Sequence, residues 1–105
     1  MTKVKVDVDA GVCQFKTVIE ADADDEMNIV FKIKSGCPHV REFGKAFTSV
    51  PVFDAIATPF CDNAIYKEAG KYLAHVACPV PCAMVKASEA AGDLALKKNV
   101  TFTIE

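Results

Sequence analysis

The sequence lacks long apolar runs, and it lacks a strong excess of charge of either sign. None of its apolar stretches has the length of an export signal or of a bilayer span. Twelve basic and fourteen acidic residues give a net charge of -2. This balance argues against a nucleic acid or an anionic membrane surface as the main partner. We therefore expect a cytoplasmic protein that binds neither nucleic acid nor membrane.

Familiar catalytic signatures are also missing. The sequence has no P-loop and no dinucleotide-binding glycine pattern, and no serine-histidine-aspartate arrangement can be singled out. The acidic stretch ADADDE, residues 21–26, lacks the glycine and the distant glutamate of a calcium loop, which favours a solvated hairpin turn. The sequence therefore names no reaction and no substrate, and it does not decide whether the protein is an enzyme.

Size and periodicity predict one small domain. With 105 residues, of which 51% are hydrophobic, the chain is expected to form a single domain over residues 1–105. Apolar residues alternate with polar ones around Val4 to Val8, and further strands are expected over residues 13–20, 27–34 and 99–105. Gly11 supplies the turn between the first two strands.

Helical spacing predicts the elements between the third and the last strand. A helix follows SGCP, a short one lies near residues 52–56 before Pro59, and a longer one covers about residues 63–77 with Asp62 or Asn63 as its cap. Another covers residues 80–91 and ends at Gly92. The predicted fold is α+β, an antiparallel sheet of about four strands, three N-terminal and one C-terminal, with about three helices packed on one face.

Five cysteines are the most informative residues of the chain. A reducing cytoplasm disfavours disulfides, so metal binding or thiol redox chemistry is the leading functional interpretation. The alternative is that free cysteines serve as small buried apolar residues.

The stretch ACPVPCAM places Cys78 at the expected N-cap of the last helix, with Pro79 just inside it. Cys82 follows about one helical turn later, so both sulfurs lie on one side of the helix start. The partial positive charge of a helix N-terminus favours a thiolate over a thiol. SGCPHV repeats this arrangement with Cys37 as the cap, and Gly36 is expected to let the chain turn.

Strand direction predicts that these cysteines meet. Cys13 begins the second strand and Cys37 follows the third, so both belong to the same end of the sheet. If the last helix starts over that end, Cys13, Cys37, Cys78 and Cys82 form a four-thiolate site. Such a set binds structural zinc or a small iron–sulfur cluster, and ligand type alone does not separate the two.

Other interpretations stay open at this point. Cys61 is expected to be buried, whereas His75 is either a replacement ligand or a surface group, and His39 is a solvated first-turn residue. Cys78 and Cys82 would also suit a thiol-active protein, as nucleophile and resolving thiol. A third hypothesis is an interaction domain with inert cysteines. An exposed edge strand would allow a homodimer, and an unknown protein partner is also left open.

Four stretches together resemble a small prokaryotic family, a conserved domain of unknown function: VDAGVC, SGCP, CPVPC and the closing KASEAAGDLALKKNVTFTIE. The resemblance spans nearly the whole chain and implies that the four cysteines of the candidate site recur in such proteins, but it brings no activity, cofactor or partner. The shorter stretch CPVP is similar to the helix start of TusA-like sulfur carriers, in which the cysteine matching Cys78 carries a persulfide. Cys82 and the three-strand opening depart from those carriers.

Overall fold

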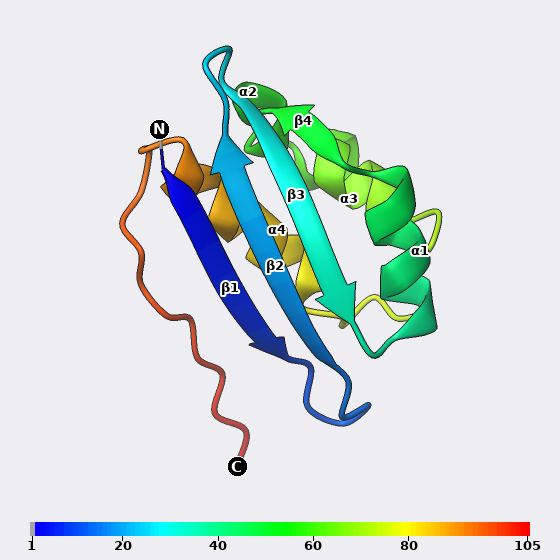
Figure 1. The fold of residues 1–105 in the computed structure, drawn as a ribbon. Coiled ribbons are helices and arrows are strands. Elements are labelled where there is room, and N and C mark those ends of the chain that lie inside the picture. The colour runs from blue at the N-terminus through cyan, green and yellow to red at the C-terminus, as the bar shows by residue number, and fades with distance from the viewer. Residues whose placement is uncertain (1) are drawn as a thin grey trace.

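A computed structural model describes residues 2–105 and shows an antiparallel sheet with helices on one face (Figure 1). The strands, in spatial and chain order, are β1 (Lys3–Asp9), β2 (Lys16–Ala23), β3 (Asn28–Ser35) and β4 (Ser49–Pro51). The helices are α1 (Pro38–Ala46), α2 (Val52–Ala55), α3 (Ala64–Ala69) and α4 (Val80–Ala91), with a 3-10 turn η1 (Phe60–Asp62) before α3. The α+β class predicted from the sequence is confirmed.

Alternation along the strands separates a buried face from a solvated one. On β2, every second residue from Thr17 to Ala23 is buried, as expected for a strand with one face on the core. Ile19 lies opposite Val6 on β1 and Ile33 on β3, so the apolar faces of three strands are in register. A one-residue slip would turn this whole face to solvent, so the apolar pattern specifies the register.

The turn between β2 and β3 is a solvated hairpin turn, as predicted. The carboxylate of Asp24 accepts hydrogen bonds from the backbone N–H groups of Glu26 and Asn28, both at 2.9 Å. These bonds replace water at the turn and hold the pKa of Asp24 below its ordinary value, with the Asn28 N–H as the main cause.

Helix α4 provides most of the helical cover of β1 and β2, and α1 packs on β3 (Figure 1). The largest fully buried side chains are Phe43, Ile19, Ile29, Ile65, Met84, Val40, Val52, Val80 and Ser88. Complete burial of one such apolar side chain stabilises the fold by roughly 1.5–3 kcal/mol. At the far end of α4, the N–H of Thr2 donates to the carbonyl oxygen of Ala91 at 3.2 Å, so α4 ends beside the start of β1.

The position predicted for the fourth strand is corrected. Residues 99–105 have the alternation of a strand but contain none, and the fourth strand is β4, which pairs with β3. Val50 of this short strand is buried, and the Phe31 N–H donates to the carbonyl oxygen of Thr48 at 2.9 Å. Alternation shows that a segment suits a sheet, but it does not say which edge the segment joins.

The long helix predicted over residues 63–77 is also corrected. Helix α3 stops at Ala69, because Gly70 weakens helix continuation and the next N–H groups bond to carbonyls only three residues back, Lys71 to Glu68 and Tyr72 to Ala69. Residues 70–79 therefore form a loop. In contrast, Asn63 as the cap of α3, the bounds of α4 and the cap at Gly92 are confirmed.

Candidate cysteine site

Cys37 is held at the end of β3 by its neighbours. The Ser35 hydroxyl oxygen accepts a hydrogen bond from the Cys37 N–H at 3.1 Å, and it lies 2.7 Å from the hydroxyl of the buried Thr17. Arg41 donates to the carbonyl oxygens of Ser35 and Gly36, both at 3.1 Å. The predicted N-cap position of Cys37, followed by Pro38, is confirmed, and the side chain is half-buried.

Gly36 lies in the bend between β3 and α1, as expected, and it also packs closely against a neighbouring loop. A Cβ at this position would lie 3.1 Å from Cδ1 of Phe15. The Gly36 N–H also donates to the carbonyl oxygen of Lys16 at 3.1 Å. The segment before α1 therefore lies against the β1–β2 loop, at the same end of the sheet (Figure 1).

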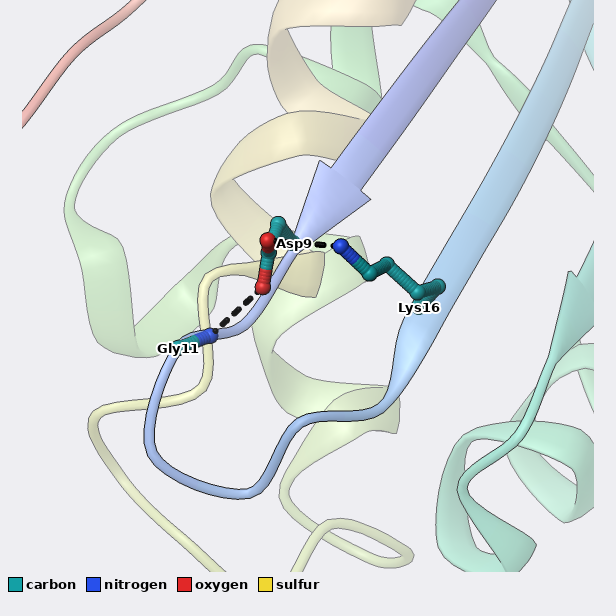
Figure 2. A network of polar contacts seen from close by, with 3 residues as sticks. All are labelled: Asp9, Gly11 and Lys16. Atoms are coloured by element: carbon teal, nitrogen blue, oxygen red, sulfur yellow. Dashed lines mark hydrogen bonds and ion pairs between the residues drawn. The ribbon is translucent and has the colours of Figure 1, made fainter.

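The β1–β2 loop, which carries Cys13, is closed by a polar network (Figure 2). Asp9 accepts a hydrogen bond from the Gly11 N–H at 3.1 Å, and Lys16 donates to its other carboxylate oxygen at 2.8 Å. Gly11 has a φ of +84°, as the predicted turn requires. The hydrogen bond from Lys16, followed by the one from Gly11, lowers the pKa of Asp9. Cys13 itself is exposed at the tip of this loop.

Helix α4, which packs on β1 and β2, brings Cys78 to the same end of the sheet. Because α4 ends beside the start of β1, its first turn lies toward the end of β1, where the β1–β2 loop begins. Helix α4 begins at Val80 with Pro79 as its cap, so Cys78 precedes the cap by one residue, a shift of one position from the prediction. The Cys78 N–H donates to the carbonyl oxygen of His75 at 3.2 Å.

Burial and two other cysteines affect the pKa of Cys78. Burial raises the pKa of Cys78, a hydrogen bond from the Val80 N–H lowers it, and the thiolates of Cys37 and Cys13 raise it further. The net effect is a pKa above the ordinary value of 9.0. Cys37 and Cys13 therefore both lie within electrostatic range of Cys78, and each of the three comes from a different segment of the chain.

Cys82 has a different neighbour. It is exposed in the first turn of α4, and its thiol interacts with the hydroxyl of Tyr66 on α3. Burial is the main cause of the raised pKa of Tyr66, and the charge of a Cys82 thiolate adds to it. The sequence analysis assigned Tyr66 only to core packing, because nothing local in the sequence shows that α3 packs beside the start of α4.

The cysteines do not form a preassembled metal site. Among residues 2–105, no group of three or more histidine, cysteine, aspartate or glutamate side chains is placed to hold a metal ion. His39 and His75 are exposed. Cys61, which was expected to be buried, is exposed as well, since it lies in the short turn η1 at the surface.

Comparison with known proteins defines the class of this chain. The chain belongs to a family of unknown function, whose model matches residues 4–104, nearly the whole chain. That family is DUF6951. No curated protein and no solved structure matches the chain. Within residues 2–105, none of the helices combines the length and apolar character that crossing a membrane requires.

Proposed function

We propose that this protein binds a metal through Cys13, Cys37 and Cys78, with Cys82 as the fourth ligand. The observation that supports the proposal is the electrostatic effect of Cys37 and Cys13 on Cys78. These three cysteines come from three separate segments of the chain. Thiolates crowded together repel one another, and a bound cation turns that repulsion into attraction. A set of four thiolates suits zinc or an iron–sulfur cluster.

The sulfur ligands suit such a metal. The loops that carry them, however, do not hold the ligands in coordinating positions. The backbone of Cys37 is held by a hydrogen bond, whereas Cys13 is on an exposed loop and Cys78 lies in the loop of residues 70–79. Metal binding would therefore draw these two loops toward Cys37 and rotate Cys82 away from Tyr66. Metal binding and ordering of the loops would be coupled, as they are in other proteins whose metal site is not formed before the metal binds.

The test is anaerobic titration of the reduced protein with Co²⁺, whose thiolate-to-metal absorption counts the sulfur ligands. We expect saturation at one equivalent with the intensity of four thiolates, and loss of tight binding in Cys13→Ser, Cys37→Ser, Cys78→Ser and Cys82→Ser. Cys61→Ser is the matched control and should bind as the unaltered chain does. If Cys78→Ser and Cys37→Ser also bind normally, the proposal is wrong.

The same experiment is followed by analysis of the purified protein without a histidine tag. Iron with acid-labile sulfide would identify a cluster, and zinc alone would identify a closed structural site. The cytoplasmic location expected from the sequence belongs to this proposal, because a thiolate site of this kind needs its cysteines reduced.

A second candidate function is thiol chemistry at Cys78, as a sulfur carrier or a dithiol redox protein. The observation in its favour is the Val80 N–H, which hydrogen-bonds to the Cys78 sulfur at the start of α4. This group stabilises a thiolate, as the similarity of CPVP to the TusA-like helix start implies. The exposed Cys82 would be the resolving thiol of a redox pair. Inert cysteines in an interaction domain would show neither metal binding nor unusual reactivity.

A further inference from the structure

Residues 94–105 leave the body of the protein with their apolar side chains uncovered. Val100, Phe102 and Ile104 are 55%, 80% and 94% exposed, and they alternate with polar residues as a half-buried strand would. The last hydrogen bond that ties this segment to α4 runs from the Leu94 N–H to the carbonyl oxygen of Glu89 at 2.8 Å. We call residues 99–105 the tail strand.

Strand β1 offers a matching surface. It lies at an edge of the sheet, it has seven residues, and its Val4, Val6 and Val8 share the face that packs on the helices. Val4 and Val8 are buried, but Val6 between them is only half-buried. An edge strand of this kind is a template for pairing with another strand.

Charge decides the direction in which a tail strand would pair with β1. In an antiparallel pair, Glu105 lies beside Lys3 and Lys5, and Lys97 and Lys98 lie beside Asp9. In a parallel pair, the same lysines lie beside Lys3 and Lys5 instead, so like charges meet at both ends. Opposite charges across a strand pair are favourable and like charges are unfavourable, so the antiparallel direction is preferred.

A tail strand cannot pair in this direction with β1 of its own chain. Thr2 binds Ala91 through the backbone, and its hydroxyl donates to the Asp93 carboxylate at 2.8 Å, so residue 94 starts beside the beginning of β1. From there the segment runs in the same direction as β1 (Figure 1). Pairing within one chain would therefore be parallel, with the unfavourable arrangement of charges.

We propose that the tail strand pairs antiparallel with β1 of a second copy of this chain, and that two copies exchange tails about a two-fold axis. With Glu105 opposite Lys3, the apolar side chains match in sequence: Ile104 faces Val4, Phe102 faces Val6, and Val100 faces Val8. Both tails lie between the two edges, so the strands of the joined sheet alternate in direction throughout. The chain from Leu94 to Lys98 must then cross two strand spacings, about 10 Å, which five extended residues span.

The test is sedimentation of the full chain over a range of concentrations, with reductant and EDTA present so that neither disulfides nor metals can join two copies. We expect a dimer, and a dissociation constant about a hundredfold higher or more in Phe102→Asp, because each of two Phe102 side chains loses its apolar cover. Phe53→Asp is the matched control, since Phe53 is 65% exposed on α2, away from β1, and should leave the dimer intact.

Hydrogen exchange gives a second, independent measurement. The backbone amides of residues 99–105 should gain protection as the concentration of the unaltered chain rises, and they should lose it in Phe102→Asp. A monomer at every concentration, a dimer that survives Phe102→Asp, or protection that is independent of concentration would overturn the proposal.

Discussion

The hydroxyl oxygen of Ser35 accepts a hydrogen bond from the Cys37 N–H at 3.1 Å, and this bond holds the backbone of Cys37, the N-cap residue of α1. Because the same hydroxyl also pairs with the buried Thr17 at 2.7 Å, it connects the cysteine to β2, an inner strand of the sheet. The backbone of Cys37 is thus tied to β3 and β2, and in the proposed metal site the loops of Cys13 and Cys78 would close onto it.

Removing this hydroxyl should weaken the fold and loosen Cys37. Ser35→Ala leaves the hydroxyl of the buried Thr17 and the Cys37 N–H without their partner, which costs about 1–3 kcal/mol of unfolding free energy. Urea unfolding measures this loss. Ser49→Ala, at an exposed position of β4, is the control and should change the free energy by less than about 0.5 kcal/mol. Equal stability of the two variants would show that the Ser35 hydroxyl contributes nothing.

The β1–β2 loop should loosen in acid. The pKa of Asp9 is held below 3.8 by Lys16 and Gly11, so its stabilising effect is fully present above the unfolded pKa and is lost as the pH falls through the lower folded value. We expect the Gly11 amide resonance in NMR spectra to titrate with a midpoint below 3.8. Asp9→Asn keeps the acceptor for Gly11 but removes the charge, so this titration should disappear.

Asn63 should tolerate little change, because one amide side chain joins α2 to α3. Its oxygen accepts from the N–H groups of Ile65 and Tyr66, while its nitrogen donates to the carbonyl oxygens of Ala55 at 2.8 Å and Ala57 at 3.0 Å. Asn63→Asp retains the cap but turns a carboxylate toward two carbonyls.

We expect Asn63→Asp to lower the free energy of unfolding by about 2–4 kcal/mol, since one buried and one partly buried hydrogen bond become repulsive contacts. The reverse change one residue earlier, Asp62→Asn, affects an exposed side chain and should cost less than about 0.5 kcal/mol. Chemical denaturation of both variants checks this difference. A cost below 1 kcal/mol for Asn63→Asp would contradict the assigned hydrogen bonds.

Gly92 should resist substitution for reasons of space. A Cβ there would lie 2.8 Å from Cγ2 of the fully buried Val52 and 3.2 Å from the carbonyl oxygen of Ser88. Gly92→Ala is therefore expected to cost about 1–3 kcal/mol, as overpacking of a core does. At Gly70, the nearest atoms are 3.4 Å away and the backbone is helical, so Gly70→Ala should be neutral or slightly stabilising. Thermal and urea unfolding of both variants distinguish a steric cost from a general effect of losing glycine.

Cys78 should be a slow nucleophile in the metal-free, reduced protein. Its pKa lies above 9.0, because burial and two neighbouring thiolates outweigh the Val80 N–H, so little thiolate is present at neutral pH. We expect iodoacetamide to modify the exposed Cys61 several-fold faster, as followed by mass spectrometry. The Cys78 rate should still be rising at pH 9. Rapid modification at neutral pH would favour the sulfur-carrier function over metal binding.

Local features of the fold were predictable from the sequence because they depend on neighbouring residues. Asn63 caps α3 by accepting from N–H groups two and three positions later. Cys37 is the N-cap of α1, and the adjacent Pro38 is its first residue. The alternation of the first three strands likewise follows from residues within each strand. The bounds of α4 were confirmed for the same reason.

Features that depend on distant segments were not predictable in this way. The strand pattern of residues 99–105 is real, but the free edge of β3 is taken by β4, whose three residues give almost no periodic signal. Strand direction predicted that Cys13 and Cys37 belong to one end of the sheet, whereas helix spacing could not show that the Cys82 thiol interacts with Tyr66. That outcome depends on how α3 packs beside α4, which the sequence does not encode locally.

The order of the strands in space equals their order in the chain, and this has a consequence for folding. Short turns join β1, β2 and β3, so these three strands can pair early and quickly, whereas the connection from β3 to β4 contains α1. Helix α4 must then return across the sheet to β1 and β2, which is the contact of greatest separation along the chain. We therefore expect Cys78 to approach Cys13 and Cys37 only when α4 docks. These three cysteines would then come together late, after most of the sheet has formed.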